Sequence, residues 1–424
     1  MSRKVTGWAA LLVAQAFGVG CFDVDDLEGV DPSTDAAMFV QPKSDAGAHD
    51  GGADASSSAT ETDAGPALCD VAHPCGATEV CAPDGFCMPR CDANGICVAA
   101  TSANGIAALV ADGPMLYYAT ESSHDAYGNA RDDAAMWSLS AAGELRKLRA
   151  LRDAPEKQVL LQDASHLYWT ASKQAFRMLK DGSADPQALY AINDGWIALV
   201  QNDQIVLSKP FAAEQSARLS CTIEVGSRDG SAPLRVVNAG HEALGCPSAV
   251  ADGHAYVSDV TRIHKIDLAS GQDTNTGLFG EIYAAIHPYL YTYDLTDQIA
   301  GYGTIYRWDL RDLARPSTVV YRAPDEDRPW PQSVKRFVGD RLYQLATKQV
   351  GNITSRRVDL VRSSLVDLGS REKLIPATFA VVRDFYVHRM LAVTDSHAFF
   401  TARPTVNGTP QDGAVLYAVP LPTR

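Results

Sequence analysis

The sequence predicts an all-β protein whose C-terminal part is a seven-bladed β-propeller, and three observations lead to this prediction. A pattern of two short apolar strands recurs seven times after residue 100. Its mean spacing from Tyr117 to Phe399, over six intervals, is 47 residues, which is the length of a propeller blade. A further alternating strand follows each pair, and a turn then leads to a fourth strand, so that each copy can form a four-stranded sheet. Hairpin dipeptides mark three of these turns, at Asp181-Gly182, Asp229-Gly230 and Ser270-Gly271.

The first twenty residues have the composition of an export signal. Arg3 and Lys4 are followed by an apolar run over residues 5–19, broken by Gln15. This run is too short to span a membrane permanently. We therefore expect residues 1–20 to be a signal peptide.

The end of this run resembles the bacterial lipobox, in which small residues precede a cysteine. The matching residues are Gly18-Val19-Gly20-Cys21, although the family usually has leucine where Gly18 stands. The resemblance implies that Cys21 is diacylated and becomes the mature N-terminus. The alternative is ordinary signal-peptidase cleavage after Ala16, and either route exports the protein.

Residues 21–68 are expected to form a disordered, lipid-anchored linker. Residues 22–68 hold eleven acidic residues against Lys43 alone, which is a local charge of -10. A segment so rich in Asp, Ala, Gly and Ser cannot bury enough apolar surface to offset its ordering entropy. The net charge of -14 for all 424 residues belongs mostly to this linker, and it argues against a nucleic-acid partner.

Residues 69–97 are expected to be a small disulfide-bonded module, because so short a segment cannot build a hydrophobic core. Its six cysteines are Cys69, Cys75, Cys81, Cys87, Cys91 and Cys97. They allow about 15 pairings, which the sequence does not resolve. The segment loosely resembles the EGF-like modules that precede propellers in surface lipoproteins of Gram-negative bacteria. Zinc binding is the competing interpretation, but the usual Cys-x2-Cys spacing is missing.

Two further cysteines, Cys221 and Cys246, lie within the propeller. We expect them to form a disulfide, and two buried thiols are the alternative. Without Cys21, the remaining eight cysteines can all pair, which fits an oxidising compartment.

Residues 98–424 carry the seven copies. The aromatic strand of each copy contains one of seven equivalent residues: Tyr117, Tyr168, Val206, Tyr256, Tyr291, Tyr343 and Phe399. The last copy ends at its third strand, near Leu421. We expect residues 96–100 to supply its fourth strand, so that the cysteine module packs against the propeller rim. Deleting residues 69–100 should then lower the melting temperature.

The sequence predicts no catalytic residue, no cofactor and no metal site. His166, His254 and His397 recur at one position of the repeat, which favours a shared role in the turn before the second strand over a joint metal site. The WD dipeptide occurs once, at Trp308-Asp309, and the sialidase Asp-box motif is absent. The recurring aromatic residues are interpreted as core.

The predicted architecture resembles cysteine-rich bacterial lipoproteins with a propeller of the NHL/YWTD-like or PQQ-like repeat type. The resemblance implies a monomer in the envelope of a Gram-negative bacterium, bound to the outer membrane only through its acyl group and facing the periplasm or the surface. It further implies that the propeller binds a protein or glycan. The alternative is an enzyme of the lactonase, glycosidase or quinoprotein type. Convergent carboxylates or histidines around the axis would favour the enzyme, and an uncharged channel would favour binding.

Overall fold

A computed structural model describes most of the cysteine module and the propeller. The described residues are 75–422 without 82–86, 94, 124–132, 157–158, 194, 202, 213–218, 239–248, 259–261, 287, 295–303, 314, 323–333, 350–355, 376–384, 407–408 and 411–412. The predicted signal peptide, Cys21, the acidic linker and Cys69 lie outside these residues. Among the described residues, no helix is long and apolar enough to cross a membrane.

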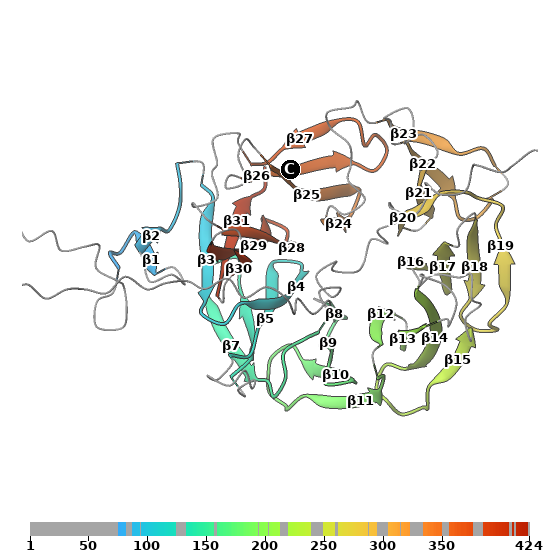
Figure 1. The fold of residues 1–424 in the computed structure, drawn as a ribbon, viewed down its shortest axis with the longest axis horizontal. Helices are drawn as coiled ribbons and strands as arrows, with labels where there is room; N and C mark the ends of the chain where they lie inside the picture. Colours follow the sequence, from blue (N-terminus) through green and yellow to red (C-terminus); the bar gives the residue numbers. More distant parts are fainter. Residues whose placement is uncertain are drawn as a thin grey trace, which may run out of the picture. The chain divides into compact units, whose positions relative to one another are not determined.

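The described chain consists of strands and turns without a helix, and seven sheets form a ring around one axis (Figure 1). This confirms the predicted seven-bladed propeller. Blade 1 contains β4 (Ile106–Asp112), β5 (Met115–Thr120), β6 (Ala135–Leu139) and β7 (Leu145–Ala150). Blade 2 contains β8 (Leu160–Gln162), β9 (His166–Ala171), β10 (Gln174–Leu179) and β11 (Gln187–Ala191). Blade 3 contains β12 (Trp196–Gln201), β13 (Gln204–Ala212), β14 (Leu219–Ser227) and β15 (Arg235–Asn238).

Blades 4 to 6 repeat this arrangement. Blade 4 contains β16 (Ala249–Ala251), β17 (His254–Ser258), β18 (Ile263–Asp267) and β19 (Asp273–Asn275). Blade 5 contains β20 (Glu281–Ile286), β21 (Tyr289–Asp294), β22 (Thr304–Asp309) and β23 (Thr318–Arg322). Blade 6 contains β24 (Val334–Val338), β25 (Arg341–Gln349), β26 (Arg356–Ser364) and β27 (Arg371–Lys373). In blades 1 to 6 the strands follow their order in the sequence, and every neighbouring pair is antiparallel.

Turn chemistry accounts for the tight hairpins. Ser172 and Lys173 join β9 to β10 with φ angles of 45° and 62°, the two positive values that a two-residue hairpin of this hand needs. In three predicted turns after the third strand, positive φ falls on the glycine alone, at Gly182, Gly230 and Gly271. A Cβ at Gly271 would lie 2.5 Å from the Val237 carbonyl oxygen of blade 3. Glycine there lets the turn approach the neighbouring blade closely.

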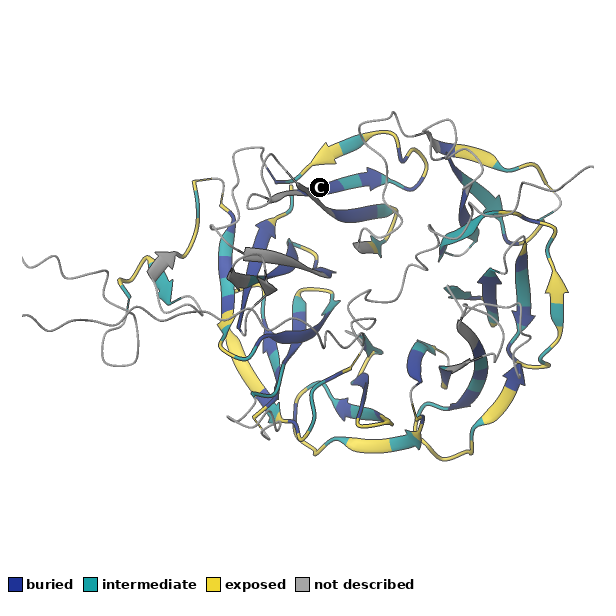
Figure 2. Cartoon of the chain, viewed as in Figure 1, coloured by how far each residue is buried: buried dark blue, intermediate teal, exposed yellow. Residues whose placement is uncertain are grey.

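The core lies between the blades. We call each interface between neighbouring blades a seam and number it by its two blades. The buried residues form seven apolar clusters, one in each seam. Because side chains alternate along a strand, consecutive residues serve different seams: Tyr168 packs in seam 2/3 and Trp169 in seam 1/2. Among the strands, the outermost ones carry most of the exposed residues (Figure 2).

Blade 7 takes its strands from both ends of the propeller. It contains β28 (Phe385–Val393), β29 (His397–Val406), β31 (Ala414–Pro420) and β3 (Cys97–Ser102), and the short β30 (Thr409–Pro410) pairs with β29. The register of β3 runs from Cys97 opposite Ala418 to Ser102 opposite Ala414. The predicted closure of the ring is therefore confirmed, with the strand shifted from residues 96–100 to 97–102.

The cysteine module contributes a two-stranded sheet of β1 (Glu79–Cys81) and β2 (Cys87–Pro89). Val80 of β1 packs against the apolar cluster of seam 6/7. The module therefore contacts the propeller rim, as expected from the position of the closing strand.

Candidate functional site

The axial mouth of the ring is built from the innermost strand of each blade and the turn that follows it. Along the ring, from β24 through β28, β4, β8, β12 and β16 to β20, each innermost strand contacts the next. Six of the seven blades carry an aspartate at or beside this turn. These residues are Asp112, Asp163, Asp203, Asp252, Asp340 and Asp395.

One hydrogen bond recurs at this end of the blades. In blades 2 to 7, the residue that directly follows the third strand donates its backbone N–H to a carbonyl oxygen in the turn before the second strand, over 2.7–2.9 Å. We call this residue the seam residue, because its side chain extends toward the preceding blade. The six seam residues are Lys180, Arg228, Leu268, Leu310, Leu365 and Leu421.

The seam residue is apolar in blades 4 to 7 and basic in blades 2 and 3. Leu268, Leu310 and Leu365 are buried in the apolar clusters of seams 3/4, 4/5 and 5/6. At the same position, Lys180 and Arg228 insert cations into seams 1/2 and 2/3. These two seams therefore combine apolar packing with ion pairs near the axial mouth.

Lys180 binds across seam 1/2. Its side chain is only 9% exposed, and its ammonium lies 2.5 Å from the Asp112 carboxylate of blade 1. The Gln162 side-chain oxygen accepts a second hydrogen bond over 2.5 Å, the Asp163 carbonyl oxygen accepts a third, and the Tyr117 ring lies 5.8 Å away. Removing a lysine ammonium from water costs free energy, and this set of partners offsets that cost.

Asp163 joins blades 2 and 3. One carboxylate oxygen accepts hydrogen bonds from the Tyr168 hydroxyl at 2.7 Å and from Arg228 at 2.8 Å. The other accepts the backbone N–H groups of Ser165 and His166 at 2.7 and 2.8 Å. Burial alone would raise the pKa of Asp163, but these hydrogen bonds and the Arg228 charge lower it to about 2.

We expect Asp163→Asn to destabilise the protein at pH 7 by about 1–2 kcal/mol. The pKa of Asp163 is lower in the folded state than the usual value of 3.8, so its stabilisation is complete above about pH 4 and decreases as the pH falls toward 2. Urea unfolding should therefore show a difference between the two proteins that shrinks below pH 4. Asp203→Asn is the matched control, because Asp203 binds the same Arg228 but is 87% exposed. An equal effect in both variants would contradict this account.

The three recurring histidines lie where the repeat predicted them, at the starts of β9, β17 and β29. His166 and His397 each share a hydrogen bond with the preceding serine hydroxyl, over 2.7 and 2.8 Å. His254 instead contacts the Asp252 carbonyl oxygen at 2.7 Å. Burial lowers the pKa of His166 and of His397, so both favour the neutral form. In the described segments, no three His, Cys, Asp or Glu side chains are grouped to hold a metal ion.

The structure resolves part of the cysteine pattern. Cys91 and Cys97 form a disulfide, and Cys75, Cys81 and Cys221 are disulfide-bonded as well. Cys87 lies in β2. Cys246, the expected partner of Cys221, is outside the described residues.

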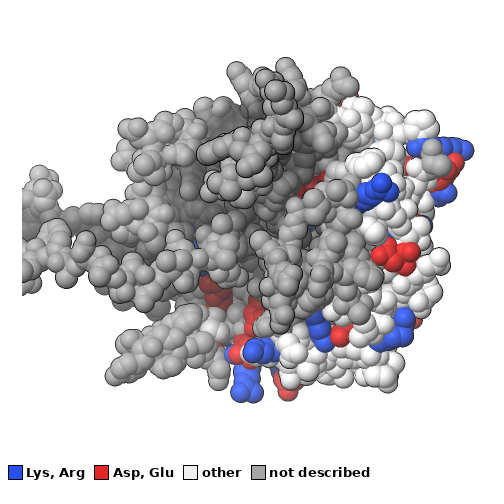
Figure 3. Space-filling view, turned by 45° about the vertical axis from the view of Figure 1, so that its right-hand side comes forward, with Lys and Arg blue, Asp and Glu red and all other residues white. Residues whose placement is uncertain are grey.

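A small cavity of about 140 Å³ lies in seam 6/7. Its polar lining includes Tyr343, Arg362 and Asp395, and Leu421 contributes to its apolar side. Arg362 is bound to Glu372 over 2.5–2.9 Å. The cavity is smaller than the roughly 300 Å³ at which small-molecule pockets begin. On the described part of the face in Figure 3, basic and acidic side chains are interspersed.

At the residues that the structure describes, the axial mouth has neither convergent carboxylates or histidines nor an uncharged lining. It is charged, but the carboxylates of Asp112 and Asp163 bind cations in separate seams. Sequence reasoning missed Lys180 and Arg228. Aligning the residue after each third strand would have shown a cation where later blades have leucine.

No family model and no curated protein matches the chain. Among solved structures, the chain is similar to a putative TolB from Agrobacterium tumefaciens, with 13% identity over 66% of this chain and 95% of that one, at a TM-score of 0.36. The AfRom2 CNH domain has 10% sequence identity to this chain. The match covers 77% of this chain and 100% of that domain, at a TM-score of 0.43. An acylaminoacyl peptidase in complex with Z-Gly-Gly-Phe-chloromethyl ketone has 9% sequence identity to this chain. The match covers 74% of this chain and 51% of the peptidase, at a TM-score of 0.48.

Proposed function

We propose that this chain is an exported binding protein, anchored in the envelope of a Gram-negative bacterium by lipid on Cys21, whose propeller binds an envelope protein or glycan. The observation that carries the proposal is the oxidation of the cysteines. Disulfides persist in exported proteins and are rare in the reducing cytosol. At least five described cysteines are in disulfides, downstream of a sequence with the features of a signal peptide and a lipobox.

A binding role is supported by how the charged groups at the axial mouth are used. Lys180, Asp163 and Arg228 form ion pairs and hydrogen bonds within the protein, so their role is to hold the blades together. A ring of rigid blades also offers broad surfaces on which the segments between strands can present contacts to a large partner.

Metabolic labelling with a radioactive fatty acid tests the anchor. The full chain expressed in a Gram-negative host should take up label and sediment with membranes, whereas Cys21→Ser should take up none and fractionate with soluble envelope proteins. Cys221→Ser is the control that removes a cysteine within the propeller and should keep the label. A full chain without label would refute lipidation at Cys21.

Affinity capture tests binding. The immobilised, disulfide-bonded protein is incubated with detergent extracts and with purified cell-wall glycan from the same host. Retention that survives washing with 0.5 M salt, on the order of three times physiological ionic strength, supports the proposal. The control is the same chain unfolded by reduction in urea. No retention from either source beyond this control would refute it.

A further inference from the structure

Blade 7 depends on a strand that lies far from it in the sequence. Blades 1 to 6 each use four consecutive strands, but β3 begins at Cys97 and pairs with β31, which begins at Ala414. Docking β3 therefore closes a loop that contains the rest of the propeller, and such closure carries an entropy cost that local hairpins do not have. The closing strand needs local features that hold it ready for pairing.

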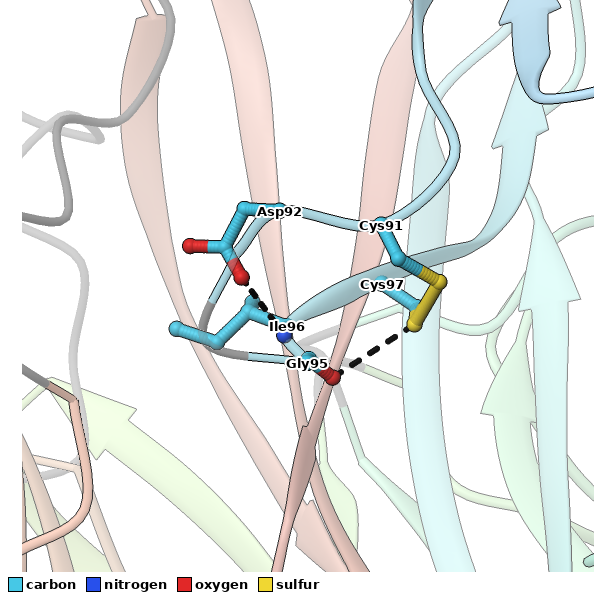
Figure 4. The surroundings of a disulfide bond; sticks show 5 residues. All are labelled: Cys91, Asp92, Gly95, Ile96 and Cys97. Atoms are coloured by element: carbon cyan, nitrogen blue, oxygen red, sulfur yellow. Dashed lines mark hydrogen bonds between the residues drawn. A yellow bond between two sulfur atoms is a disulfide. The ribbon is translucent and has the colours of Figure 1, made fainter.

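A short disulfide-closed hairpin supplies this order directly before β3 (Figure 4). The Cys91–Cys97 disulfide joins its two sides, and Cys97 is also the first residue of β3. Within the turn, Asp92 donates its N–H to the Ile96 carbonyl oxygen at 2.9 Å, and its carboxylate accepts the Ile96 N–H at 2.8 Å.

The same hairpin covers the start of the outer edge of β3, at Cys97 and Val98. The Val98 N–H donates to the Arg90 carbonyl oxygen over 2.6 Å, on the opposite side of β3 from β31. An uncovered outer edge would be a site for pairing with other chains. Ile96 and Val98, 3% and 5% exposed, pack in seam 6/7, and Ala100 packs in seam 7/1. The disulfide thus lies at the start of a strand whose side chains pack in two seams.

Solvent reaches this disulfide. Cys91 is exposed and Cys97 is half-buried, whereas Cys221 is 3% exposed. A thiolate must reach a sulfur atom to break a disulfide, so an external dithiol would attack the Cys91–Cys97 bond before the bond at Cys221.

We propose that the Cys91–Cys97 disulfide is a redox latch on ring closure. A dithiol reductant supplies two electrons and two protons; the sulfur–sulfur bond breaks, two cysteine thiols form, and the reductant becomes a disulfide. The hairpin then loses its covalent closure, β3 detaches more often from β31, and blade 7 opens. A disulfide oxidant reverses the step. The biological consequence rests on the proposed export: the ring closes firmly only after the chain reaches an oxidising compartment.

Hydrogen–deuterium exchange on the purified full chain tests the latch. In Cys91→Ser/Cys97→Ser, we expect backbone exchange of residues 97–102 and 414–420 to accelerate at least about ten-fold, while β17 and β18 of blade 4 keep their rates. The matched control is Cys221→Ser/Cys246→Ser, which should leave exchange in blade 7 unchanged. Unchanged exchange at β3 in the latch variant would overturn the proposal.

Mild dithiothreitol treatment of the unmodified chain provides a second readout if the latch variant does not fold. Exchange of β3 should rise as the Cys91–Cys97 bond is reduced, before the bond at Cys221, and fall again on reoxidation with oxidised glutathione. Equal acceleration in all seven blades would mean global unfolding and would also overturn the proposal. Because these measurements use purified protein, a failed latch is distinguishable from failed lipid labelling or partner capture.

Discussion

Deleting residues 69–100 lowers the melting temperature by on the order of 10 °C, which is the largest effect that we expect from any change in this protein. The deletion removes most of β3, including buried Val98 and Ala100, together with Ile96. Burial of a valine or isoleucine side chain contributes roughly 1.5–3 kcal/mol, and each kcal/mol shifts the melting temperature of a large domain by about 2–4 °C. Circular dichroism during heating measures the shift.

The control for this deletion is a chain without residues 69–89. It keeps the Cys91–Cys97 hairpin and all of β3, so it should melt close to the full chain. If both deletions lower the melting temperature equally, the cysteine module and not the closing strand carries the stabilisation. An unchanged melting curve after removal of residues 69–100 would contradict the role of β3 in closing the ring.

Phe400→Ala should lower the free energy of unfolding by about 3–5 kcal/mol. Phe400 of β29 is fully buried in seam 6/7, and its ring stacks on Tyr417 of β31 with 5.2 Å between centroids. The substitution leaves a cavity between sheets that cannot collapse without moving both strands. Urea unfolding at pH 7 measures the change.

Phe279→Ala is the matched control, since Phe279 is 65% exposed. The Arg262 guanidinium carbon lies 5.9 Å from the centroid of the Phe279 ring. We expect it to change the free energy of unfolding by less than about 1 kcal/mol. Comparable losses from the two phenylalanines would mean that the seams are not the main source of stability.

The strand pattern of the propeller could be predicted because it depends on short stretches of chain. Alternation around Tyr117 or Tyr168, followed by turn residues, defines a hairpin within about a dozen residues. The missing fourth strand of the last copy was also predictable, since an incomplete sheet leaves an edge to cover. The predicted bounds of this strand differ from those of β3 by one residue at its start and two at its end, because side-chain packing selects the register.

The site was less predictable from the sequence. Lys180 and Asp112 are separated by 68 positions and come from different blades, so no local pattern pairs them. The three histidines share a position in the repeat, but each lies in its own blade. That shared position predicted similar turns and could not bring the three side chains together.

By itself, the sequence determined the number of blades, the order of strands within blades 1 to 6 and the place of the closing strand, because hairpins join neighbours along the chain. Only the tertiary structure decided that Cys91 pairs with Cys97, that Lys180 binds Asp112 across seam 1/2, and that Asp163 binds Arg228. These pairings depend on which side chains come into contact when separate sheets stack. The contacts are set by distance and burial in three dimensions, and the spacing of residues along the chain does not encode them.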